Sequence, residues 1–278
     1  TVIRVNGVLS LEKEIFGPVL HITTFEASEI DKIINDINSS GYGLTFGLHT
    51  RIDERVEHIT SRLNVGNIYV NRDQIGAVVG SQPFGGEGMS GTGPKAGGPY
   101  YVSRFKKAPL PEHKLVREDY IDPAKVQVAL DKAKTDKHTP LETIDMPGPT
   151  GETNRWSTFA RGTILCLGPT KADAGKQAKI AQQMGCAAVC VAPGLDASVG
   201  LSGFLARTAL SNLSGFDGVA LWSGVNDLRK ARQALAERKG PLLPLISTSE
   251  MKQLCVLERH LCIDTTAAGG NASLLAAQ

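Results

Sequence analysis

The sequence lacks long apolar runs, a strong net charge and an N-terminal leader. No stretch approaches the roughly 18 apolar residues that a membrane-spanning helix needs, so we expect no transmembrane segment. Thirty basic and 28 acidic residues leave a formal charge of +2. So small a charge gives no reason to expect nucleic acid as a partner. Without a secretory signal we expect a cytoplasmic protein.

The chain also lacks an initiator methionine. Its first residue, Thr1, opens a strand-like run. We interpret it as a piece of a longer protein. The missing N-terminal parts of that protein are then its first expected partners.

Cysteine is scarce and shows no spacing typical of metal ligands. The five cysteines are Cys166, Cys186, Cys190, Cys255 and Cys262. Cys186 and Cys190 are four residues apart, but no second pair lies nearby, which disfavours a zinc site. Four of the five lie in apolar stretches of the sequence, where a free thiol behaves as a small hydrophobic side chain. The six histidines show no ligand spacing either, so the sequence predicts buried, reduced thiols and no metal.

The first block of the chain, residues 1–105, alternates strand and helix patterns and ends in a glycine-rich stretch. Ser28 with Asp31 has the form of a capping box. Isoleucines then repeat at helical spacing as far as Gly41, and a second amphipathic helix is expected over residues 52–63. A strand over Asn67–Val70 precedes nine glycines between residues 74 and 98. A loop of that length inside a compact domain is usually functional or disordered.

The rest of the chain divides into three further parts. Residues 106–160 are expected to be a linker region with one helix, Pro123–Lys134, and a turn-rich loop over 146–152. Residues 161–253 alternate apolar strands with helices, one of them expected over Ala197–Leu213. This pattern predicts an α/β fold, a doubly wound parallel sheet covered on both faces. Its first loop, Gly168–Lys176, matches no dinucleotide or P-loop fingerprint, so a Rossmann-like domain without such a site is expected. Residues 254–278 form a small-residue-rich tail.

Two motifs carry chemistry. In Glu14–Val19 a carboxylate stands two residues before Phe16 and a Gly-Pro turn, a combination that can grip a ribose and an adjoining ring. A surface glutamate and a core phenylalanine explain the same residues equally well. In residues 74–98, glycines let backbone N–H groups approach an anion, and Phe84 supplies an apolar wall. A flexible linker is the alternative, but linkers lack anchors such as Val78, Phe84 and Met89.

The order and separation of these motifs resemble the C-terminal part of the aldehyde dehydrogenase superfamily. The fuller match is to Δ1-pyrroline-5-carboxylate (glutamate-γ-semialdehyde) dehydrogenases, and it rests on three segments: Asn67–Arg72 (NIYVNR), Gly80–Gly86 (GSQPFGG) and Gly97–Tyr101 (GGPYY). The sequence after residue 146, including the segment His260–Asn271, resembles the extended C-terminus of the bacterial proline utilization A (PutA) family. The resemblance therefore implies the end of an aldehyde dehydrogenase catalytic domain, followed by an aldehyde-dehydrogenase-like domain.

The resemblance also implies roles for single residues. Glu14 and Phe16 would contact the nicotinamide ribose of NAD. Gly76 and Ala77 would hold the α-carboxylate of L-glutamate-γ-semialdehyde, and Phe84 would pack on its aliphatic part. No cysteine of this chain stands in the sequence context of the family nucleophile, so no catalytic residue is expected here. The second block would cover a tunnel between two active sites, and the tail would pack on the dehydrogenase.

We therefore expect part of a bifunctional enzyme that oxidises proline to glutamate, using FAD in an upstream domain and NAD in the dehydrogenase. The fragment alone is expected to be inactive. A homodimer and a peripheral location of the parent at the inner membrane stay open. Two alternatives also remain: a non-catalytic scaffold derived from an aldehyde dehydrogenase, and an aldehyde dehydrogenase for another substrate.

Overall fold

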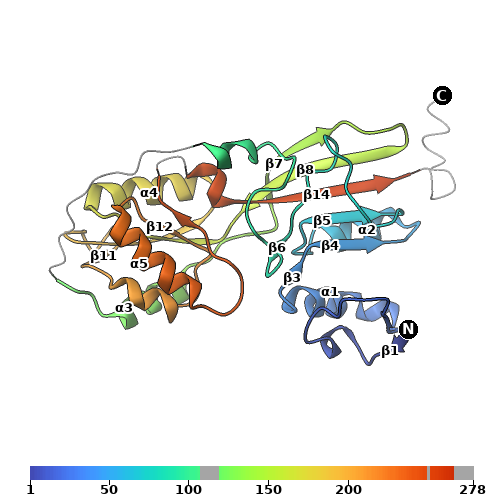
Figure 1. Cartoon of the computed structure of the whole chain (residues 1–278), viewed down its shortest axis with the longest axis horizontal. Coiled ribbons are helices and arrows are strands. Elements are labelled where there is room, and N and C mark those ends of the chain that lie inside the picture. The colour runs from blue at the N-terminus through green and yellow to red at the C-terminus, as the bar shows by residue number, and fades with distance from the viewer. Residues whose placement is uncertain (107–118, 249–250, 266–278) are drawn as a thin grey trace.

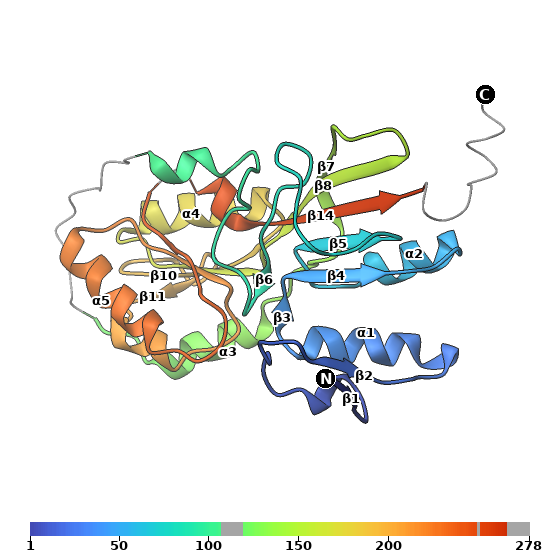
Figure 2. The same cartoon turned by 45° about the vertical axis from the view of Figure 1, so that its right-hand side comes forward.

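The computed structural model describes residues 1–106, 119–248 and 251–265. Two five-stranded sheets organise these residues, with one sheet on each side of the molecule in both views (Figures 1 and 2). The expected tail segment Ala267–Asn271 lies outside the described residues. No helix in the described ranges is long and apolar enough to cross a bilayer.

The first sheet combines strands from both ends of the chain. Its order is β4-β5-β14-β8-β7. β14 runs parallel to β5 and antiparallel to β8, so a strand from the end of the sequence lies between an early strand and a hairpin. In Figure 1 this strand, coloured red, extends from the second sheet across into the first. The bounds are β4 Thr45–Leu48, β5 Asn67–Val70, β7 Pro140–Met146, β8 Glu152–Ala160 and β14 Val256–Asp264.

A small N-terminal layer packs beside this sheet. β1 (Val2–Arg4) pairs in parallel with β2 (Leu20–Ile22), and the helices α1 (Ile30–Ser39) and α2 (Asp53–Thr60) follow. Ile34 of α1 enters the core that the buried side chains of α2 and β5 form. Short elements complete this part of the chain: η1 Val8–Ser10, η2 Ala27–Glu29, β3 Tyr42–Gly43, β6 Glu87–Gly88 and η3 Val102–Phe105.

The capping box expected from Ser28 and Asp31 is wrong. Glu26 and Glu29 form the box instead, two residues earlier, at the start of η2. Asp31 is engaged elsewhere, because its carboxylate contacts His58 at 2.6 Å and Arg62 at 2.7 Å. The side chain that sequence spacing assigned to a helix end therefore links α1 to α2.

The second sheet confirms the expected α/β fold. All of its pairings are parallel, in the order β11-β10-β9-β12-β13. One core lies between the sheet and α3 and α5, and a second lies on the side of α4. Figure 2 shows α4 on the opposite face of the sheet from α3 and α5. The bounds are β9 Thr163–Cys166, β10 Ala187–Ala192, β11 Leu201–Ser202, β12 Gly218–Ala220, β13 Leu245–Ile246, α3 Pro123–Lys132, α4 Lys171–Gln183, α5 Val225–Ala236, η4 Arg207–Ser211 and η5 Lys252–Cys255.

The helix expected over Ala197–Leu213 is also wrong, because this segment forms β11 and the short turn η4. A Cβ atom at Gly200 would lie 2.5 Å from the carbonyl oxygen of Cys190, so the chain passes too close to β10 for a helix. Arg207 then turns inward and forms a buried ion pair with Asp227 of α5 at 3.0 Å. A buried charge needs such a partner, and this pairing fixes the turn.

The expected linker region contains two long strands that the sequence did not indicate, β7 and β8, in addition to its helix α3. The turn-rich loop over 146–152 joins them. In β8 every second side chain is buried, but Asn154 and Thr158 are among those that point inward. Polar residues at inward positions hide the alternation of apolar and polar residues that marks a strand.

Candidate functional site

The glycine-rich segment is fixed to β5 by a buried lysine. Lys95 is 2% exposed, and its ammonium group donates to the carbonyl oxygen of Gly66 and to Oδ1 of Asn67, both at 2.7 Å, and to the carbonyl oxygen of Gly85. Burial lowers the pKa of Lys95 to about 7. Gly66 must be glycine, because a Cβ there would lie 1.9 Å from the oxygen of Gly85. The segment is therefore a packed part of the domain and not a flexible linker.

A cavity of about 390 Å³ opens within this segment. Gly76 and Gly80 have φ angles of +77° and +87°, which other residues rarely adopt, so both turns depend on glycine. Phe84 and Ala96 exchange two backbone hydrogen bonds of 3.0 and 2.8 Å, which fixes the aromatic side of the cavity. The lining residues are Gly76, Ala77, Val79, Gly80, Gln82, Phe84, Ala96 and Gly97.

The structure thus brings together the three residues expected to contact substrate, Gly76, Ala77 and Phe84. It does not bring Glu14 and Phe16 to them. Both lie in the loop between η1 and β2, and neither lines the cavity. Phe16 is 92% exposed, so its ring is free to contact a group outside the described residues.

A polar network links the cavity to β8 and β14. Glu152 of β8 accepts hydrogen bonds from Arg72 at 2.8 Å, from Gln82 at 3.1 Å and from Asn154 at 2.7 Å. Gln82 also donates to the sulfur of Cys262 on β14 at 3.5 Å. Arg72 and Gln82 lie in segments that carry the family resemblance. Nothing in the sequence linked them to Glu152, because Gln82 lies 70 positions from Glu152 and 180 from Cys262.

All five cysteines are free and buried, as expected from their apolar context. Cys262 lies nearest the cavity among them, through its contact with Gln82. Burial raises the pKa of its thiol to about 11. A protonated, buried thiol is a poor nucleophile, so Cys262 contributes packing and not covalent chemistry.

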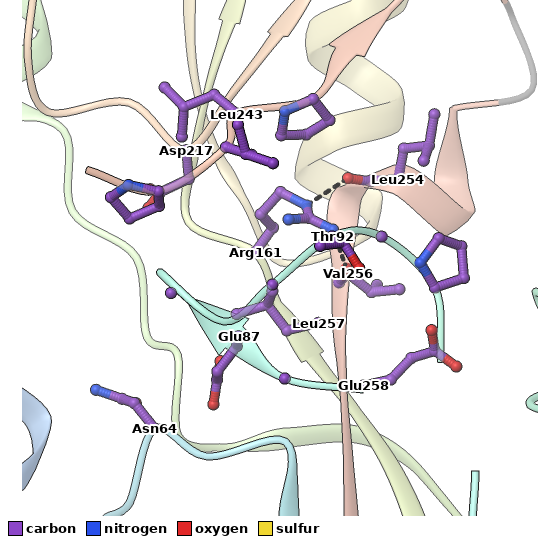
Figure 3. Close-up of a pocket in the computed structure, with 18 of the residues that line it drawn as sticks. Asn64, Glu87, Thr92, Arg161, Asp217, Leu243, Leu254, Val256, Leu257 and Glu258 are labelled. Atoms are coloured by element: carbon purple, nitrogen blue, oxygen red, sulfur yellow. Dashed lines mark hydrogen bonds between the residues drawn. The ribbon is translucent and has the colours of Figure 1, made fainter. Parts of the chain in front are cut away.

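A second cavity, of about 690 Å³, lies between the glycine-rich segment and the parallel sheet (Figure 3). Arg161 lies at its centre in this view, and its guanidinium donates to the carbonyl oxygens of Leu254 at 2.6 Å and Val256 at 2.8 Å. Glu258 faces the same space, and burial raises the pKa of its carboxyl group. Among the described residues no group of His, Cys, Asp and Glu side chains could hold a metal ion. We interpret this cavity as the polar seam between the two sheets.

Comparison with known proteins agrees with the geometry. The profile of the aldehyde dehydrogenase family matches residues 6–108. The bifunctional protein PutA of Rhizobium meliloti is 38% identical over 99% of this chain and 25% of its own length. PutA of Salmonella typhimurium is 36% identical over 99% of this chain and 24% of its own length. The 1-pyrroline-5-carboxylate dehydrogenase of Bacillus subtilis is 46% identical over 33% of this chain and 18% of its own length.

A solved structure shows the same fold. Proline utilization A from Corynebacterium freiburgense matches 89% of this chain and 25% of its own chain, with a TM-score of 0.53 and 22% identity. The chain therefore spans about a quarter of the length of the relatives that it matches. Residues 6–108 are thus similar to the aldehyde dehydrogenase family, and nearly the whole chain is similar to the C-terminal region of bifunctional PutA proteins.

Proposed function

We propose that this chain is the C-terminal part of a bifunctional enzyme that oxidises proline to glutamate, and that its glycine-rich cavity binds L-glutamate-γ-semialdehyde. The observation that carries the proposal is the meeting of Gly76, Ala77 and Phe84 in one cavity. Backbone N–H groups beside glycines suit the α-carboxylate, and an aromatic wall suits the two methylene groups between Cα and the aldehyde. The alternative of a scaffold would not need such a cavity.

In this proposal the chain contributes contacts to the substrate and to NAD. Gly76 and Ala77 bind and orient the substrate, Phe84 excludes water from its aliphatic part, and the aldehyde carbon points away from the anchored carboxylate. NAD, when bound, accepts the hydride of the aldehyde carbon. Glu14 and Phe16 fit a contact with its ribose, because both side chains are exposed on one loop. The thiolate that attacks the aldehyde and the FAD-dependent step belong to preceding parts of the protein.

The parallel-sheet unit keeps the role that the PutA resemblance implies for it, which is to cover a tunnel between two active sites. Its first loop, Gly168–Lys176, carries no dinucleotide fingerprint. We also propose a cytoplasmic location and a homodimer for the parent protein.

Two substitutions in the full-length protein separate the two ligand contacts. We expect Phe84→Ala to raise the KM for semialdehyde about tenfold, because it removes the apolar contact between the ring and the substrate, and to leave the KM for NAD unchanged. Glu14→Ala should raise the KM for NAD and leave the KM for semialdehyde unchanged, because a charged hydrogen bond to the ribose contributes about 1.5–3 kcal/mol. Initial rates of NADH formation measure both constants. Met89→Ala is the control, since Met89 lies in the same segment but does not line the cavity. A fall in NAD affinity for Phe84→Ala with unchanged semialdehyde KM would refute the assignment.

The isolated chain should form no NADH from semialdehyde and NAD. The thiol that must attack the aldehyde is expected upstream, and Cys262 below the cavity is held protonated by burial. Turnover above background by the purified chain would show that the nucleophile lies within it.

A further inference from the structure

Gln82 lies between the substrate cavity and the two strands that approach it from the C-terminal part of the chain. It is 2% exposed. Its backbone N–H donates to the carbonyl oxygen of Val78 at 2.9 Å, and its side-chain oxygen accepts the N–H of Val78 at 3.1 Å. Val78 follows Ala77 directly in the sequence. Gln82 thus closes the turn that carries the cavity lining, with one bond from its backbone and one from its side chain.

The other end of the Gln82 amide faces Glu152. Its nitrogen donates to Oε1 of Glu152 at 3.1 Å and to the sulfur of Cys262 at 3.5 Å. Arg72 and Asn154 hold Glu152 in place from two further directions. The Glu152 side chain is only 12% exposed, so its charge is compensated by these donors and not by bulk water.

The charge of Glu152 also decides which way the Gln82 amide points. An ionised carboxylate only accepts hydrogen bonds, so the amide nitrogen must face it. The amide oxygen is then left to face the N–H of Val78. A carboxylate on β8 therefore selects the one amide orientation that holds the turn beside the cavity.

We propose that Gln82 and Glu152 are positioning residues that hold the loop 76–80 in its substrate-binding conformation. Through them the hairpin β7–β8 and the strand β14, which lie outside the segment matched to the aldehyde dehydrogenase family, set the affinity for substrate. This inference rests on the proposed function, because it takes the loop 76–80 as the site of the substrate carboxylate.

A charge-swap cycle in the full-length protein tests the link. Gln82→Glu places two carboxylates face to face and should raise the KM for semialdehyde about tenfold, the effect of losing one hydrogen bond to a charged group. The double variant Gln82→Glu with Glu152→Gln restores a donor opposite an acceptor. Its KM should return to within about threefold of the wild type, with kcat changed little in every variant. Glu142→Gln is the control, because it neutralises an exposed carboxylate of the same hairpin.

Hydrogen exchange gives a readout independent of turnover. The Val78 amide should exchange faster in Gln82→Glu and return toward the wild-type rate in the double variant. Thermal melting of each variant checks that the fold is kept.

The outcomes separate this inference from the proposed function. Recovery of both KM and exchange in the double variant supports the inference. The positioning role is refuted, and the proposed function stands, if Phe84→Ala raises the semialdehyde KM but Gln82→Glu does not. The same holds if the KM of the double variant is no lower than that of Gln82→Glu. If none of these variants changes the semialdehyde KM, the cavity is not the substrate site and both fail.

Discussion

His260 lies in the middle of β14 with no exposed surface. Burial, together with the nearby positive charges of Lys95 and Arg72, lowers its pKa to about 4, while the charge of Glu152 opposes the shift. The imidazole is therefore neutral at neutral pH. Burying the neutral ring costs less than burying an imidazolium, which would need a charged or hydrogen-bonding partner.

The molecule should consequently lose stability in mild acid. The unfolded state binds a proton at His260 below about pH 6.5, but the folded state binds it only near pH 4, so unfolding takes up a proton in between. The contribution of His260 to the free energy of unfolding is fully present above pH 6.5. It falls by roughly 3 kcal/mol as the pH drops to 4. Urea unfolding across this range measures the slope. His260→Gln should flatten it, and His138→Gln, at an exposed position, should not. Equal slopes in wild type and His260→Gln would place the acid sensitivity elsewhere.

At the scale of elements, β6 and β14 are joined by a buried ion pair. Arg259 of β14 donates to Glu87 of β6 at 2.7 Å and to Asn64 at 3.0 Å, and its guanidinium lies 4.4 Å from the ring centroid of Phe159. Both charged side chains are about 5% exposed. This contact fixes the middle of the glycine-rich segment against β14.

Removing one partner of this pair should be far costlier than removing both. Arg259→Met leaves the Glu87 carboxylate buried without its partner, and we expect a loss of about 3–5 kcal/mol in the free energy of unfolding. The double variant Glu87→Leu with Arg259→Met should recover much of that loss, because it buries no charge. Lys171→Met is the matched control: it breaks an ion pair whose side chains are 51% and 65% exposed, and it should cost less than about 1 kcal/mol. Additive losses in the double variant would contradict this account.

Elements with a local pattern were predictable from the sequence, and long-range pairings were not. Short apolar runs separated by helical periodicity predict strands over residues 163–167, 187–192 and 218–222 and a helix over 171–184. These ranges are close to the observed bounds of β9, β10, β12 and α4. The hairpin β7–β8 was missed because Asn154 and Thr158 point inward. The cavity could be anticipated in part, since Gly76, Ala77 and Phe84 are close in the chain. Glu152 could not, because it reaches Gln82 across 70 residues and carries no motif of its own.

At the scale of the whole molecule, two of the described connections between the sheets lie together. β8 leads into β9 through Arg161, and η5 leads into β14. The backbone N–H of Arg161 donates to Cys255 at 2.9 Å, and its side chain bonds Leu254 and Val256, so the two crossings are held side by side. The polar seam of Figure 3 lies beside these crossings.

The two sheets should therefore differ in stability within this chain. Among the described residues, the parallel sheet has fifteen buried side chains in the core on each face, whereas the core of the first sheet and its helices has six. Since buried apolar area is the main favourable term in folding, the parallel-sheet unit should unfold at the higher urea concentration. The chain carries a reporter in each part, because its two tryptophans are Trp156 on β8 and Trp222 after β12. With Trp222→Phe, the fluorescence of Trp156 should change first; with Trp156→Phe, that of Trp222 should change later. Circular dichroism of the unsubstituted chain should then show both transitions. A single transition common to all three measurements would mean that the two crossings at Arg161 couple the sheets into one cooperative unit.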